Sequence, residues 1–301
     1  MSKHSILPIF LSGLLGLGLC GSPARAQEKN MTLAYIETGL KELNNTDKHV
    51  ALQILAKELT KNVDTRLAVT PLNSMREMLD LANAGKLNYS LINSYFYLKN
   101  IEQLRPLITD EIWAAQRGQD LEEDYVLIVN NDTDYRDIRS LSGKRLSTYT
   151  DDLLMGFYLQ QLIQREANTS PERFFKSIKD TRTLSQSVLD VFFKTSDSCI
   201  VPNHIVDLVV ELNPAVKQGI KIVHHSGANF IMALILVFKN NPETEANAIR
   251  GNLQELPNSV AGQQILELFH IKTITQIPPE SLNNMLSLYR QHQENQHKKT
   301  H

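Results

Sequence analysis

The sequence predicts an α/β protein of two lobes, each a mostly parallel sheet flanked by helices, joined by two crossing strands. Three observations lead to this expectation. Short apolar runs alternate with helical patterns along the chain, the order that builds parallel sheets covered by helices. The length of 301 residues exceeds what one hydrophobic core usually supports. An apolar, β-branched run at 125–129 precedes a strand–turn–helix pattern at 142–163, which indicates the opening of a second lobe.

The first 26 residues have the pattern of a cleaved secretion signal. A weakly basic start precedes an apolar run at 6–19, and Ala24-Arg25-Ala26 places small residues at the two positions that a signal peptidase reads. The apolar run is shorter than the roughly 20 residues of a transmembrane helix. Cys20 leaves a lipid-anchored alternative open, although Leu19 stands where a lipoprotein signal carries Gly, Ala or Ser. We expect a mature, exported protein.

Charge and cysteine content exclude several classes of function. The formal net charge is −2 at pH 7, and removal of Lys3 and Arg25 makes the mature chain more acidic. A mildly acidic surface argues against nucleic acid and anionic membranes as partners. Only Cys199 remains after cleavage, so no internal disulfide can form. Its apolar surroundings predict a small buried side chain, with a reactive thiol as the open alternative.

The first lobe is predicted to begin with strand, helix, strand, helix and strand. Its expected strands are 31–36, 66–70 and 87–93. Asp47 is expected to cap the first helix, and Asn73 or Ser74 the second, because short polar side chains bond free N–H groups there. Gly85 ends the second helix.

The second lobe repeats this order. The strand at 125–129 is expected to cross into it from the first lobe, and its further expected strands are 145–148, 198–201 and 220–224. A segment near 224–230 is expected to cross back, and a strand at 229–238 returns to the first lobe. Its helices are expected to begin at Asp152 and Pro202 and to cover 183–194. Three more helices, at 242–253, 260–269 and 279–291, complete the chain before a frayed tail. We therefore assign 27–126 and 228–301 to the first lobe and 127–227 to the second.

Three stretches resemble a known family: LDLANAGKLNYSLINSYFYL at 79–98, YVLIVNNDTDYRDIRSLSGKR at 125–145 and VLDVFFKTSDSCIVPNHIVD at 188–207. In them the chain resembles type II periplasmic solute-binding proteins of the phosphate, phosphite and phosphonate-binding branch, which serve ABC transporters. The resemblance covers nearly all of residues 31–290 in order. It implies a periplasmic monomer that closes on a small-molecule ligand, holds no cofactor and delivers the ligand to an ABC permease. A sensor that signals to a membrane kinase, cyclase or chemoreceptor is the alternative.

One turn departs from the family pattern. Phosphonate-binding relatives carry a hydroxyl-rich turn where this chain has Thr150-Asp151-Asp152. If both carboxylates face the cleft, each like-charge contact with a phosphonate costs about 4 kcal/mol at ~4 Å. The open alternative is that they cap the following helix and point to solvent. An amine or zwitterion held between Asp151 and Arg182 would fit the first arrangement.

The candidate ligand-binding residues lie in loops at strand ends, where polar groups converge without belonging to the core. Arg182 is the expected clamp for an acidic group, and Tyr95 is expected either to contact the ligand or to pack beneath the cleft. The full set is Tyr35, Thr38, Asn93, Ser94, Tyr95, Tyr149, Thr150, Asp151, Arg182, Asn203, His204 and Ser226.

Neither a metal site nor a catalytic site is expected. His224 and His225 are neighbours on one strand and face opposite sides, and the sequence has no cluster of ligands at metal-binding spacing. The nucleophile elbow, phosphate-binding loop, dinucleotide fingerprint and zinc-protease motifs are all missing. We therefore expect no enzyme activity.

The leader pattern predicts that the mature protein begins at Gln27. N-terminal sequencing of protein from the native host checks this, because cleavage after Ala26 leaves an unmodified Gln27. A lipid-modified N-terminal Cys20 would contradict it.

Overall fold

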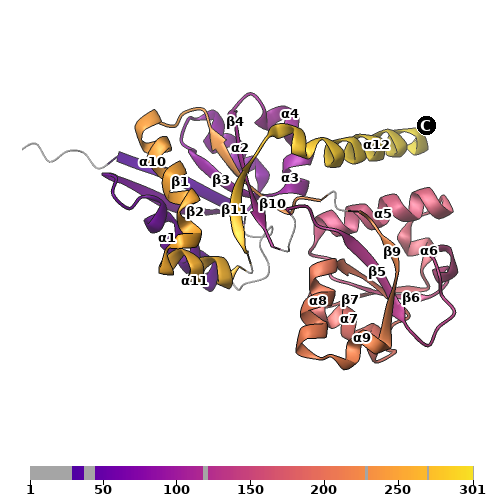
Figure 1. The fold of residues 1–301 in the computed structure, drawn as a ribbon. Helices are drawn as coiled ribbons and strands as arrows, with labels where there is room; N and C mark the ends of the chain where they lie inside the picture. Colours follow the sequence, from indigo (N-terminus) through magenta and orange to yellow (C-terminus); the bar gives the residue numbers. More distant parts are fainter. Residues whose placement is uncertain (1–28, 37–44, 118–120, 228–229, 270, 301) are drawn as a thin grey trace, which may run out of the picture.

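The computed structural model describes residues 29–36, 45–117, 121–227, 230–269 and 271–300, and every structural statement below concerns these. The predicted leader and Thr38 lie outside the described residues. The two predicted lobes correspond to two sheets, each covered by helices on both faces (Figure 1). The expected two-lobed α/β fold is confirmed.

The sheet of the first lobe has six strands in the order β11-β4-β10-β3-β1-β2. The strands β1, β2 and β3 are parallel, and β10, β4 and β11 add to them in antiparallel fashion. Their bounds are β1 Lys29–Ile36, β2 Thr65–Leu72, β3 Tyr89–Asn93, β4 Ile108–Gln116, β10 Ala233–Phe238 and β11 Thr273–Ile277.

Two helical layers cover this sheet. One face packs against α1 (Asn45–Leu59), α10 (Glu243–Gln254) and α11 (Val260–Leu268), with the short 3-10 helix 256–258 between the last two. The other face packs against α2 (Met75–Asn83), α3 (Ser94–Lys99), α4 (Ile101–Leu104), the 3-10 helix 279–282 and α12 (Asn283–Thr300).

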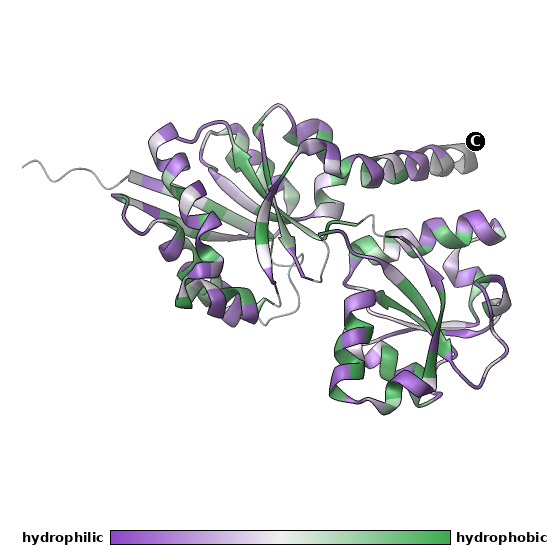
Figure 2. Ribbon diagram, in the orientation of Figure 1, coloured by the Kyte–Doolittle hydropathy of each residue, from purple (hydrophilic) through white to green (hydrophobic). Residues whose placement is uncertain are grey.

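The sheet of the second lobe has five strands in the order β7-β6-β8-β5-β9. Their bounds are β5 Tyr125–Asn130, β6 Arg145–Thr148, β7 Ser177–Asp180, β8 Ser198–Pro202 and β9 Ile220–His225. The helices α7 (Leu184–Phe192), α8 (Asn203–Leu212) and α9 (Ala215–Gly219) cover one face. The helices α5 (Leu153–Ala167) and α6 (Pro171–Phe174) cover the other, and a 3-10 turn at 139–141 precedes β6. Apolar residues concentrate in the strands and polar residues on the outer helix faces (Figure 2).

Three expectations need correction. The sheets are mixed rather than mostly parallel, because β4, β10 and β11 in the first and β5 and β9 in the second run antiparallel to their neighbours. The strands β4 and β11 were not predicted. The tail was expected to fray, but α12 continues to Thr300.

The chain crosses between the lobes twice, and the two crossings touch. The run at 125–129 was expected to cross, but β5 pairs along its length with β8 and β9 inside the second sheet. The first crossing lies just before β5, and the second lies between β9 and β10. They meet in an antiparallel bridge between Glu123 and Phe230, where the Glu123 N–H donates to the Phe230 carbonyl over 2.7 Å.

A second contact joins the lobes through aromatic rings. Tyr95 of α3 lies 6.1 Å from Phe157 of α5 and 6.4 Å from Tyr289 of α12, measured between ring centroids. Figure 1 shows α12 extending from the first lobe over α5.

Within the described residues, none of the helices has the length and apolar character needed to cross a membrane.

Candidate ligand-binding site

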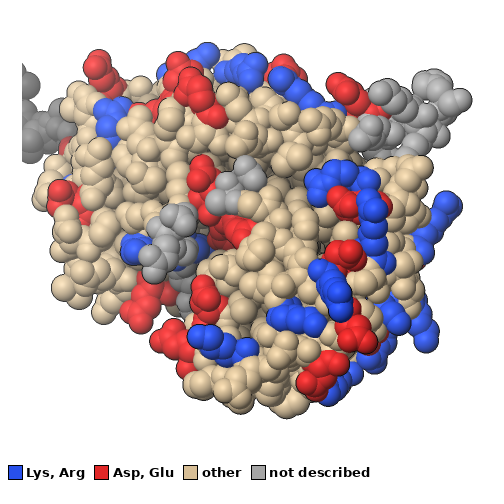
Figure 3. Space-filling model, turned by 45° about the vertical axis from the view of Figure 1, so that its right-hand side comes forward, with Lys and Arg blue, Asp and Glu red and all other residues tan. Residues whose placement is uncertain are grey.

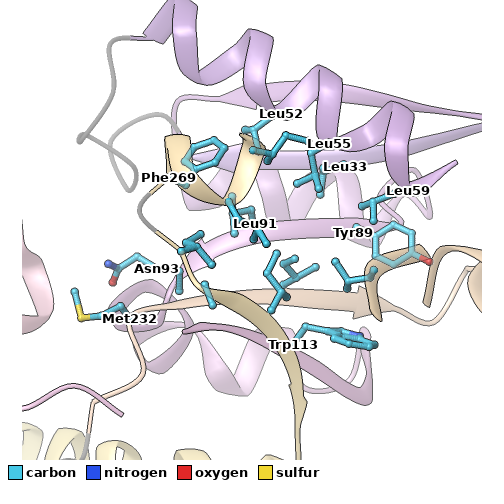
Figure 4. A pocket seen from close by; sticks show the side chains of 18 of the residues that line it. Leu33, Leu52, Leu55, Leu59, Tyr89, Leu91, Asn93, Trp113, Met232 and Phe269 are labelled. Carbon is cyan, nitrogen blue, oxygen red and sulfur yellow. The ribbon is translucent and has the colours of Figure 1, made fainter. Parts of the chain in front are cut away.

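A continuous cavity of about 100 Å³ lies where the two lobes meet and extends into the first lobe. Side chains from both lobes line its mouth. The first lobe supplies Asn93 and Arg117 with Met232 from the second crossing, and the second lobe supplies Tyr149, Asp151, Asp152 and Leu184. The deeper part runs between the sheet of the first lobe and its helices α1, α10 and α11 (Figure 4).

Asn93 ends β3 and begins α3. Its Oδ1 accepts a hydrogen bond from the Tyr95 N–H over 2.8 Å, so the side chain is held at the mouth as a helix cap. Ser94 follows and is fully buried, and its hydroxyl has no hydrogen-bond partner among the described residues. The Ser94 N–H donates to the Met232 carbonyl over 3.0 Å, which ties α3 to the second crossing.

The two carboxylates of the second lobe have different surroundings. Asp152 is 7 % exposed and caps α5, since its Oδ1 accepts from the Met155 N–H over 2.9 Å. The hydroxyl of Tyr125, in β5, donates to the same oxygen over 3.4 Å. Asp151 is partly exposed and lines the cavity beside it. Asp152 therefore both caps the helix and borders the cavity, so neither alternative from the sequence describes it alone.

Arg117 is a site residue that sequence reasoning missed. It follows β4 and lines the mouth of the cavity. Burial, then the charges of Asp152 and Glu123, raise the pKa of Tyr125 well above its usual value, while Arg117 opposes them. The only available signal was the alternation of β4, and that strand was not predicted.

Arg182, the expected cation of the cleft, lies elsewhere. It is exposed and is not among the residues that line the cavity. Its backbone N–H donates to Oε1 of Gln186 over 3.3 Å at the start of α7. Thr150 is also exposed, and its N–H donates to Oδ1 of Asp180 over 3.0 Å.

Two predicted tyrosines pack into the protein instead of lining the cavity. Tyr35 was expected after the first strand, but it lies within β1 at 1 % exposure, with its hydroxyl 3.3 Å from Nδ1 of His49. Tyr95 takes the second of its two expected roles, because its ring belongs to the contact with Phe157 and Tyr289.

The remaining candidates surround the crossing segments. Ser226 Oγ accepts from the Tyr125 N–H over 2.8 Å and lies 3.1 Å from Oδ1 of Asp124. The Asn203 N–H donates to the Asp124 carbonyl over 2.8 Å. Nδ1 of His204 lies 3.2 Å from Oε2 of the buried Glu123, without hydrogen-bond geometry. These residues thus connect the second lobe to its hinge.

The charges around the cleft are mainly acidic. Acidic side chains gather along the middle of the face in Figure 3, where the lobes meet. At the mouth, Asp151 and Asp152 stand against Arg117, whereas the second lining cation, Arg250, is paired with Glu111 through hydrogen bonds away from the mouth. A simple dianion therefore meets a weakened field, although Arg117 still offers a positive group.

The neighbouring histidines His224 and His225 have separate partners. His224 contacts the Tyr158 hydroxyl over 2.7 Å, whereas His225 contacts Oδ2 of Asp124 over 2.6 Å, so the neighbours face opposite ways. Searching the described residues finds no group of three or more His, Cys, Asp or Glu able to hold a metal ion. Cys199 is fully buried in β8, and burial, with a smaller effect of Asp190, raises the pKa of its thiol.

The family comparison matches most of the chain. The model of the family described as "ABC transporter, phosphonate, periplasmic substrate-binding protein" matches residues 44–282. None of the curated proteins matches the chain.

Solved structures with a similar fold include three binding proteins. PhnD1 from Prochlorococcus marinus in complex with methylphosphonate has a TM-score of 0.59 at 15% identity, covering 88% of this chain and 98% of its own. A binding protein component of an ABC phosphonate transporter from Pseudomonas aeruginosa has a TM-score of 0.57 at 10% identity, with coverages of 87% and 86%. The aliphatic sulphonate binding protein SsuA from Escherichia coli has a TM-score of 0.54 at 12% identity, with coverages of 90% and 88%. At these identities the likeness shows the fold.

The contacts of Asp152 predict a stability difference between two adjacent substitutions. Asp152→Ala removes the cap of α5 and the acceptor of the Tyr125 hydroxyl, and should lower the free energy of unfolding by about 1–2 kcal/mol. Asp152→Ser keeps a capping oxygen and should lose less than half of that. Urea denaturation measures both. Equal stability of Asp152→Ala and wild type would contradict the capping role.

Proposed function

The chain belongs to the family of phosphonate-type periplasmic substrate-binding proteins of ABC transporters, and from this premise we propose how its own cleft captures a solute. The solute is a small polar molecule with an acidic group, and it carries an amine as well. One observation carries the proposal. Arg117 of the first lobe and Asp151 of the second lobe line the same cavity, so one molecule with both charges can contact both lobes.

Closure of the lobes follows from this division of contacts. A ligand that touches only one lobe gains the same energy whether the lobes are open or closed. A ligand that bridges Arg117 and Asp151 gains its full contact energy only when the lobes approach. The crossings at Glu123 and Phe230 supply the axis for that motion.

The charge of the mouth favours a zwitterion over a simple phosphonate. A guanidinium can pair with phosphonate or carboxylate oxygens in two-pronged fashion. Asp151 would repel a second negative charge but would pair with an ammonium group. Of the pair that the sequence suggested, Asp151 and Arg182, Asp151 stays in the proposal and Arg117 takes the place of Arg182.

Processing and partner complete the proposal. Family membership places the protein in the periplasm and gives it an ABC permease as partner. We add that residues 1–26 are removed on export and that the protein acts as a monomer, since one copy of the chain supplies both walls of the cleft. The family does not favour the sensing alternative. It consists of solute-binding proteins, so the residues of the cleft are assigned to binding rather than catalysis.

Calorimetry with two ligands that differ by one amine tests the charge pairing. Aminomethylphosphonate should bind wild type at least tenfold tighter than methylphosphonate. Asp151→Ser should reverse this preference, because it removes the partner of the amine and the repulsion of the phosphonate. Arg117→Gln should weaken the binding of both ligands about tenfold or more, because it removes a charge-assisted hydrogen bond.

Arg182→Gln is the matched control, since Arg182 is exposed and outside the cavity lining. It should leave both affinities unchanged. Binding of methylphosphonate to wild type at micromolar or tighter affinity would show that the carboxylates do not govern selectivity. An effect of Arg182→Gln as large as that of Arg117→Gln would refute the proposed site.

A further inference from the structure

The deep part of the cavity is less polar than the mouth, where the charged groups of the proposed solute are held. Its walls are the sheet of the first lobe on one side and α1, α10 and α11 on the other. Figure 4 shows Asn93 and Met232 at one end of this space and Tyr89 and Leu59 at the other. The side chains between these ends are apolar and include Leu33, Leu52, Leu55, Leu91, Ile235 and Leu266.

The polarity of the cavity changes in one direction along the strands. Alternate residues of a strand share a face, so Tyr89, Leu91 and Asn93 form one row in β3. The row along β4 contains Trp113 and Ala115 and continues to Arg117. Both rows are apolar inside the lobe and polar at the cleft. From Tyr89 to Asn93, β3 rises by four steps, or about 13 Å, and this is the approximate length of the cavity along that strand.

The charges at the far end of the cavity pair with each other. The Glu111 carboxylate accepts hydrogen bonds from Nε of Arg250 over 3.0 Å, from Nη2 of Arg250 over 2.5 Å, and from the Trp113 indole N–H over 2.8 Å. Burial raises the pKa of Glu111, but the hydrogen bonds from Arg250 and Trp113 outweigh it and lower the pKa overall. The pair is therefore ionised and mutually neutralised, so this end offers no net charge to a ligand.

We infer that this cavity receives an apolar chain of the same solute whose charged head is held between the lobes. The inference rests on the proposed function for the position of the head. A dry cavity lined by leucine, isoleucine and aromatic side chains binds apolar molecules, and one of ~150 Å³ holds benzene. The cavity of about 100 Å³ suits a chain of several carbons. The substrate class is thus an amphipathic amino acid analogue, with an acidic group, an amine and an alkyl or aryl tail.

A series of ligands with one head and increasing tails tests the inference. Aminomethyl-, 1-aminobutyl- and 1-aminooctylphosphonate keep the zwitterionic head and lengthen the chain. Each methylene that enters the cavity should tighten binding roughly fourfold. We therefore expect 1-aminobutylphosphonate to bind at least tenfold tighter than aminomethylphosphonate, with a smaller gain per carbon once the cavity is full.

Two variants alter the cavity without touching the charged head. Ala233→Leu fills the space beside Asn93, where the apolar part of the cavity begins. It should remove the gain from the longer tails, measured as the ratio of each affinity to that for aminomethylphosphonate. Leu91→Ala enlarges the space and should shift the optimum to longer chains. Ala215→Leu, at an exposed position of α9, is the matched control and should bind all three ligands as wild type does. If Ala233→Leu does not fold, Leu91→Ala still tests the prediction.

A neutral probe separates this inference from the proposed function. Octan-1-ol should raise the melting temperature of wild type but not of Ala233→Leu, because it needs the cavity and not the charged head. Equal affinity for the three phosphonates would overturn the inference and leave the proposed function standing. Stabilisation by octan-1-ol without binding of any phosphonate would support the cavity and overturn the proposed head. Failure of both probes would overturn the inference as well.

Discussion

The contact between the two crossing segments is the constraint on which the arrangement of this protein depends. The Glu123–Phe230 bridge holds the segments together, and the backbone of Tyr125 bonds Ser226 through both its N–H and its carbonyl. Tyr125 itself is fully buried and packs 4.9 Å from the ring of Phe230. Because both crossings are fixed at one place, the carboxyl end of β3 and the turn after β6 face the same cavity.

The boundary between the lobes has two different sides, an aromatic contact and the cavity. The rings of Tyr95, Phe157 and Tyr289 lie on the α3 and α12 side of the first sheet, and the cavity lies on the α1, α10 and α11 side. The aromatic contact excludes water and buries apolar surface, which stabilises one side of the boundary. The cavity side instead carries charges of opposite sign, which can respond to a ligand. This asymmetry places the proposed binding residues on one side of the two crossings.

Local sequence signals predicted most of the helices and strands, but two antiparallel strands and their pairing were missed. The cap Ser74 was readable, because its side-chain oxygen bonds an N–H only three residues away. Asp47 was wrongly expected to cap α1, since that helix already begins at Asn45 and Asp47 lies in its first turn. The antiparallel strands β4 and β11 were missed, since their pairing depends on residues more than a hundred positions distant in the chain. Missing β4 also hid Arg117, the cation at the mouth. The depth of the cavity arises from packing between α1, α10, α11 and the sheet, which no local pattern records.

The distance between the lobes tests the central claim, that one ligand bridges both. Spin labels at Arg182→Cys in the second lobe and Lys272→Cys in the first lobe occupy exposed positions, and the buried Cys199 should remain unlabelled. Pulsed electron resonance on the mature protein should show a shorter label distance with saturating 1-aminobutylphosphonate than without it. In the Arg117→Gln protein, a far higher ligand concentration should be needed to shorten the distance between the labels. An unchanged distance in wild type, with binding verified by calorimetry, would contradict closure on a bridging ligand.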